Sequence, residues 1–269
     1  MFQAQLKGKL TRAEENLEDL LTSNVFGCLK YLPAEDGILP LLRATKNEDG
    51  IPVLQDLSEI EKTTYEFWPY LTEANCKPCE PDVLIRIETK TRRRLLVLVE
   101  SKLLSGKSSS APNDEIPIDQ LAKEWDNLSS IARREGWVPL LIYITAHTEY
   151  PKDEIEESAR EYSGKREKSM TVGWLSWRDL INIYQDSKHA IVQDMIEILK
   201  KQGLVYFDGF LCFAEKLWDW IFSPVVLSNE AFSWHWGGFL INWGYVDIRT
   251  QYIWPKSENE LKILWRYSL

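Results

Sequence analysis

The sequence predicts an α/β fold in which a central mixed β-sheet is flanked by helices. Residues 81–103 form two apolar runs joined by the polar turn TKTRRR, which indicates a β-hairpin. Residues 118–145 contain a helical pattern followed by the apolar strand VPLLIYIT. A strand, a helix and a further strand in this order favour a right-handed parallel crossover. The sheet should therefore combine antiparallel and parallel pairs.

An amphipathic helix is expected ahead of the hairpin, over residues 11–31. Thr11 is a plausible N-cap, Glu14 its capping-box partner, and Leu17, Leu20 and Leu21 share one face that should pack on the sheet. Residues 33–63 have mixed periodicity and several prolines and glycines, so we expect loops there, with one short helix near residues 54–62.

The chain beyond the parallel crossover should close the core and then change character. A short strand is expected at 171–175, followed by helices at 177–185 and 188–201. We assign residues 1–205 to the core and 206–269 to a C-terminal extension, because seven of the twelve tryptophans follow residue 217. A packed extension or a protein contact surface fits this extension better than a base-stacking surface, because few cations accompany the rings.

Composition limits the classes of function. The formal net charge of −9 argues against a protein that coats nucleic acid through many cationic contacts, although it is compatible with an enzyme that clusters carboxylates around metal ions. The N-terminus lacks the long apolar run of a signal peptide or membrane span. Four cysteines in 269 residues are too few for a disulfide scaffold. We therefore expect a cytoplasmic protein without membrane association.

One group of polar residues interrupts the apolar hairpin. In VESKL, Glu100 and Lys102 project to the same side of their strand, because side chains alternate between the two faces. Asp82 opens the preceding strand, where antiparallel pairing can bring its carboxylate beside Glu100. Two acids and an amine should converge on one site.

Two neighbouring carboxylates in an apolar hairpin repel each other, and a hard divalent cation resolves this conflict. Oxygen ligands from Asp82, Glu100 and the backbone carbonyl of Ser101 suit Mg²⁺, with Mn²⁺ as a substitute. A bound metal can lower the pKa of a water and neutralise charge on a phosphodiester. Lys102 could orient that water or stabilise the developing charge. The alternative interpretation is a turn aspartate with a cross-strand salt bridge.

The segments EPD at 80–82 and ESK at 100–102, on consecutive strands, resemble the PD-(D/E)XK nuclease superfamily of restriction and repair enzymes. This resemblance implies a restriction-endonuclease-like core, a requirement for Mg²⁺ or Mn²⁺, and DNA as substrate. It also implies further site residues. The N-terminal helix would supply an additional metal-binding acid, Glu14 or Glu18, and the helix beginning DQLAKEW would supply Gln120 to position the substrate.

The resulting hypothesis is an endonuclease of prokaryotic antiviral defence or restriction, with Asp82, Glu100, Lys102 and Gln120 as catalytic residues. A homodimer is plausible, because cutting both strands with one site per chain requires two copies. A companion ATPase or sensor protein could activate cleavage. The alternative is a catalytically silent nuclease fold that serves as a nucleic-acid-binding or protein-assembly subunit.

Overall fold

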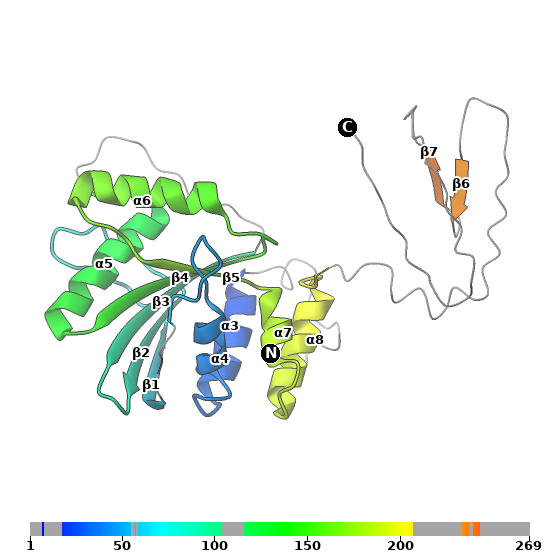
Figure 1. The fold of residues 1–269 in the computed structure, drawn as a ribbon, viewed down its shortest axis with the longest axis horizontal. Helices are drawn as coiled ribbons and strands as arrows, with labels where there is room; N and C mark the ends of the chain where they lie inside the picture. The colour runs from blue at the N-terminus through cyan, green and yellow to red at the C-terminus, as the bar shows by residue number, and fades with distance from the viewer. Residues whose placement is uncertain are drawn as a thin grey trace, which may run out of the picture. The chain divides into compact units, whose positions relative to one another are not determined.

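A computed structural model describes residues 7, 18–54, 57, 59–103, 116–206, 233–236 and 239–242 of the chain. The chain divides into two compact units, Met1–Phe207 and Asp208–Leu269. The first unit is built on a five-stranded sheet with the strand order β1-β2-β3-β4-β5 (Figure 1). These strands are β1 (Ile60–Phe67), β2 (Val83–Thr89), β3 (Arg94–Lys102), β4 (Val138–Thr145) and β5 (Val172–Ser176).

The sheet is mixed, which confirms the expected α/β class. Strands β1, β2 and β3 pair antiparallel, whereas β3, β4 and β5 pair parallel. The predicted hairpin is β2–β3, and α5 (Gln120–Glu135) forms the predicted crossover from β3 to β4. A second crossover helix, α6 (Lys152–Arg166), connects β4 to β5.

Helices cover the sheet in two layers (Figure 1). On one face lie α3 (Glu18–Lys30), α4 (Ile38–Ala44), α7 (Asp179–Tyr184) and α8 (Ala190–Lys201), and on the other lie α5 and α6. Strand β3 packs against the helices on both faces of the sheet, because its alternate apolar residues belong to two separate hydrophobic clusters. This double burial explains why β3 reads as a continuous apolar run. No helix in the described ranges is long and apolar enough to cross a membrane.

The predicted helix near residues 54–62 is wrong, because residues 60–62 begin strand β1. The sequence IEKTTYEF is rich in β-branched and aromatic residues, and the charged side chains exposed on it suit the edge of a sheet. Helix α4, which lies in the segment expected to form loops, and helix α6 were not predicted. Helix α3 falls within the predicted 11–31 helix, whose residues 11–17 lie outside the described ranges.

The ends of helix α5 fix its position over the carboxyl end of β3. The Asp119 side chain accepts a hydrogen bond from the Ala122 backbone N–H at 3.2 Å, which makes it the N-cap. Gly136 ends the helix in the left-handed conformation with φ of 71°. Gln120 is therefore the first residue of the helix, held beside the end of the strand that carries Glu100.

The second unit contains a two-stranded antiparallel sheet in the described part of its chain. Strand β6 (Ser233–Trp236) pairs with β7 (Phe239–Asn242). Two of the tryptophans of the C-terminal extension, Trp234 and Trp236, belong to β6. The role of this extension stays a prediction.

Candidate active site

The two predicted acids lie side by side at the end of the β2–β3 hairpin. Val83 pairs with Val99 in the antiparallel register of β2 and β3. Asp82 precedes Val83 and Glu100 follows Val99, so the two acids occupy the next opposing positions of the hairpin. Both side chains are largely inaccessible to solvent, with 8% of Asp82 and 2% of Glu100 exposed. Carboxylates this deeply buried need compensating partners.

Asp82 is held by Ser101. The backbone N–H and the hydroxyl of Ser101 both donate to Oδ2 of Asp82, at 2.8 Å and 2.6 Å. The same hydroxyl lies 2.7 Å from Oγ1 of Thr22 on helix α3. Strands β2 and β3 and helix α3 are thus joined at this point. The sequence indicated only the backbone carbonyl of Ser101 as a site atom, whereas its hydroxyl and amide fix the aspartate.

Glu100 receives hydrogen bonds from the two other predicted catalytic side chains. Nζ of Lys102 lies 2.7 Å from Oε1 of Glu100, and the side-chain amide of Gln120 donates to the same oxygen. These contacts bring the end of β3 and the first turn of α5 together. The structure therefore gathers Asp82, Glu100, Lys102 and Gln120 into one cluster.

Glu18 completes this cluster from the start of helix α3. Its Oε1 accepts from Nζ of Lys102 at 3.2 Å, and its Oε2 accepts from the backbone N–H of Leu103 at 2.7 Å. Glu14, the alternative acid on the predicted N-terminal helix, lies outside the described ranges. Lys102 is thus shared between two carboxylates, one from each side.

Burial and mutual repulsion shift the proton affinities of these groups. Burial, followed by the charge of Asp82, raises the pKa of Glu100 to about 7, although Lys102 opposes this shift. Burial also raises the pKa of Asp82, with the Ser101 hydrogen bonds acting against it. For Lys102, burial lowers the pKa, but Glu100 and Glu18 outweigh it and the net effect is a rise. The amine stays protonated at neutral pH beside an acid that titrates there.

The oxygens left over in this cluster suit a divalent cation. Among the described residues, both hydrogen bonds to Asp82 fall on Oδ2 and both hydrogen bonds to Glu100 fall on Oε1. Each acid therefore keeps one oxygen for another partner. The described ranges contain no group of three or more His, Cys, Asp or Glu side chains placed to hold a metal ion. Two carboxylates with water as the remaining ligands is a set that Mg²⁺ accepts.

Glu124 is an acid near this cluster that the sequence reasoning missed. It follows Gln120 by four residues on α5, and this spacing puts the two side chains on one helix face. Only 1% of the residue is exposed, and Oε2 has no hydrogen-bond partner among the residues that the structure describes. Burial and then the charge of Glu100 raise its pKa well above the ordinary range. The spacing Gln-x-x-x-Glu after the hairpin was the signal available in the sequence.

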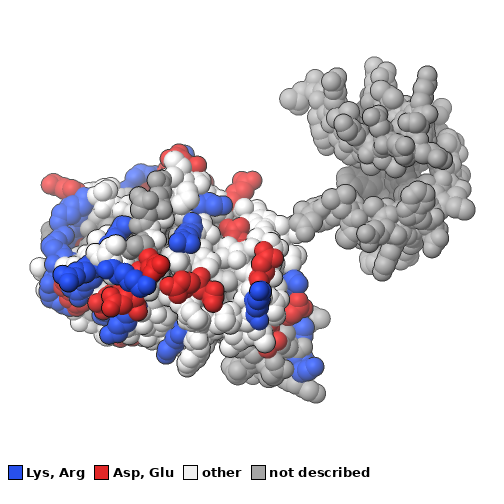
Figure 2. Space-filling view, turned by 60° about the horizontal axis from the view of Figure 1, so that its bottom comes forward, with Lys and Arg blue, Asp and Glu red and all other residues white. Residues whose placement is uncertain are grey.

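The basic turn KTRRR lies at the opposite end of the hairpin. Arg94 lies six positions before Glu100 on β3, which is roughly 20 Å along an extended strand. The Arg94 guanidinium stacks over the Trp137 ring at 4.2 Å and donates to the Glu135 carbonyl at 3.1 Å. On the face drawn in Figure 2, basic and acidic side chains are interspersed. The turn is therefore no part of the acid cluster.

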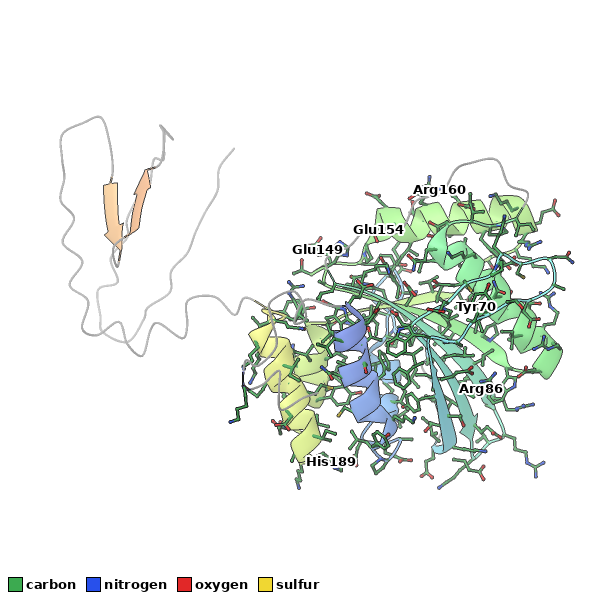
Figure 3. All side chains as sticks on the ribbon, turned by 180° about the vertical axis from the view of Figure 1, so that it is seen from behind. Tyr70, Arg86, Glu149, Glu154, Arg160 and His189 are labelled. Carbon is green, nitrogen blue, oxygen red and sulfur yellow. The ribbon has the colours of Figure 1, made fainter. Side chains whose placement is uncertain are left out.

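A cavity of about 460 Å³ lies in the connection from β4 to α6, lined by residues 147–154. Tyr143, which pairs with Glu100 in the β3–β4 register, donates its hydroxyl proton to Oε2 of Glu154 at 2.8 Å. Glu154 and Glu149 both belong to this lining, near the first turn of α6 (Figure 3). The lining contains three acids, Glu149, Asp153 and Glu154, and one lysine, Lys152, so this cavity is a poor phosphate site.

Comparisons of the chain with protein-family models, with curated proteins and with solved structures find no match.

Proposed function

We propose that this protein is a metal-dependent nuclease with a restriction-endonuclease-like core that hydrolyses phosphodiester bonds of DNA. The observation that carries the proposal is the meeting of Asp82, Glu100 and Lys102 at the end of the β2–β3 hairpin, where one oxygen of each acid receives no hydrogen bond from the described residues. A purely structural site would need only the Glu100–Lys102 salt bridge, and the Ser101 hydrogen bonds satisfy one oxygen of Asp82. Neither contact accounts for the burial of a second acid directly beside Glu100.

Each residue has a separate role in this proposal. Asp82 and Glu100 would hold Mg²⁺ or Mn²⁺, and the ion would supply charge neutralisation at the phosphodiester and an acidified water. Lys102, protonated and only 13% exposed at its side chain, would stabilise the charge that develops on the phosphate oxygens. Gln120 would keep the Glu100 carboxylate oriented through its hydrogen bond, and Glu18 would hold the Lys102 amine beside Glu100. Ser101 would fix Asp82.

The rim of the cluster offers a surface for the bases of a nucleic acid. The backbone N–H of Trp68, just after β1, donates to the Asp82 carbonyl at 2.9 Å. Trp68 is 38% exposed, and Tyr70, which is labelled in Figure 3, is 68% exposed. Trp68 also has a positive φ of 47°, which is strained for a bulky side chain and is a reason to consider a functional role. We assign base stacking to these two rings.

A cleavage assay tests the proposal directly. Purified protein would be incubated with plasmid, linear duplex and single-stranded DNA and with RNA, in Mg²⁺, Mn²⁺ or EDTA. We expect metal-dependent cleavage of DNA that Glu100→Gln abolishes. Glu88→Gln is a matched control, because Glu88 lies near the basic turn at the other end of the hairpin. Absence of cleavage by the wild-type chain with every substrate and both metals would contradict the proposal.

The second candidate is a catalytically silent nuclease fold that binds nucleic acid or assembles with a protein. The net charge of −9 favours assembly with a protein over binding of nucleic acid, and the lack, in the described ranges, of three side chains placed to hold a metal ion favours a silent fold. Binding of a nucleic acid without cleavage in the same assay would support it. A cytoplasmic location, a role in prokaryotic defence or restriction, a homodimer and a companion ATPase or sensor are further proposals that rest on the resemblance.

A further inference from the structure

Glu124 is a buried acid for which the fold provides no visible purpose. It sits on the sheet-facing side of α5, within an apolar layer that includes Leu121 and Leu128. Within the described part of the chain, its Oε2 is buried without a hydrogen-bond partner. An unsatisfied buried polar atom of this kind destabilises the fold, and more so if the group is charged. An apolar side chain of similar size would avoid that cost.

The surroundings of Glu124 point toward the acid pair. Gln120, one helical turn earlier on the same face, reaches Oε1 of Glu100. Besides Lys123, the charges that act on Glu124 are those of Glu100, Asp82 and Lys102. Because Gln120 contacts Glu100 and Glu124 follows one turn later on the same face of α5, Glu124 belongs to the part of the sheet-facing layer next to the cluster.

Three buried acids near one protonated amine leave an excess of negative charge. Lys102 is shared by Glu100 and Glu18, so it does not compensate Asp82 and Glu124 as well. Protonation removes the charge but leaves Oε2 of Glu124 without a partner. A divalent cation with its water shell removes both difficulties, because it supplies positive charge and oriented O–H donors.

We propose that Glu124 is the third acid of the cation site, a positioning residue that acts behind Glu100 on the water shell of the ion. This inference rests on the proposed function, because it requires a divalent cation at Asp82 and Glu100. Direct coordination by all three acids is not assigned, since no group of three such side chains in the described ranges is placed to hold an ion. The cation is a hard one that prefers oxygen ligands, and Mg²⁺ and Mn²⁺ are the probes.

Metal binding without nucleic acid tests the inference. Isothermal titration calorimetry with MnCl₂ and MgCl₂ and thermal unfolding in EDTA and in Mn²⁺ would be measured for the full chain. The variants are Glu124→Gln and Glu124→Leu, which keep the approximate size of the side chain. Glu135→Gln, the same change at the far end of α5, is the control.

Glu124→Gln should weaken Mn²⁺ binding about 10–100-fold, because residues that orient the ligands of a metal ion without binding it contribute about this much to metal affinity. In EDTA Glu124→Leu should unfold at the wild-type temperature or above it, because it removes the buried unsatisfied polar group, whereas Glu124→Gln keeps one. Wild-type Mn²⁺ affinity in Glu124→Gln would overturn this inference alone, even if Glu124→Leu is more stable. Failure of the wild-type chain to bind either cation would overturn the metal-dependent function as well.

Discussion

Replacing Glu100 by glutamine should change how the stability of the protein depends on pH. Folding raises the pKa of this acid from 4.5 to about 7, and a tenfold change in proton affinity corresponds to about 1.4 kcal/mol. The folded state therefore binds this proton about 3 kcal/mol more tightly than the unfolded state does. Because the pKa is raised, this contribution is fully present below the unfolded pKa and is lost as the pH rises through about 7.

Urea unfolding in EDTA between about pH 4 and about pH 8 measures this effect. The wild-type free energy of unfolding should fall relative to that of Glu100→Gln by about 3 kcal/mol across this range. Because the charge of Glu100 also raises the pKa of Glu124, the difference between the two proteins reports Glu100 together with its coupling to the neighbouring acids. Saturating Mg²⁺ should reduce the fall, because the cation takes the place of the proton. Parallel profiles for the two proteins would refute the reasoning that burial and Asp82 dominate at this position.

Three further predictions follow from the site and the core. Lys102→Ala should lower the cleavage rate roughly 100-fold or more, whereas Lys90→Ala, at the far end of the hairpin, should leave it unchanged in a plasmid assay. Tyr70→Ala should weaken binding of single-stranded DNA by about 1–3 kcal/mol in fluorescence anisotropy; equal losses for Val138→Ala, a control at the opposite end of the strands, would count against stacking. Gly173→Ala should lower the stability by about 1–3 kcal/mol in thermal unfolding, because the added Cβ would collide with the Thr45 methyl group, and an unchanged midpoint would contradict this packing.

The sequence predicted the part of the fold whose signals are local and strong. The β2–β3 hairpin, α5 and β4 have apolar patterns that match their burial on the two faces of the sheet. Strand β1 was missed because its burial comes from pairing with β2 and packing against α3, and its own sequence is mostly polar. Helix α6 was missed because only three of its residues are classed as buried, so its apolar stripe is weak.

The candidate site was predicted where strand alternation determines geometry. Alternation placed Glu100 and Lys102 together, and hairpin pairing placed Asp82 beside them. The parts that escaped prediction depend on tertiary packing. Glu18 was one of the two acids that the resemblance implied, but its contact with Lys102 across 84 residues was not predicted. The burial of Glu124 was not predicted either, because it depends on how closely α5 lies on the sheet. Sequence spacing gives the helix face of such a residue, but it does not give the depth at which that face is buried.

The contact between Thr22 and Ser101 has a consequence for when the chain can act. The two hydroxyls are 79 residues apart in sequence, and the link from Glu18 to Lys102 spans 84. Contacts between such distant segments close large loops and are slow to form during folding. A nascent chain whose first helix has not docked would lack the support of both Asp82 and Lys102. Under the proposed function, hydrolytic competence would then be acquired only after the tertiary structure is complete.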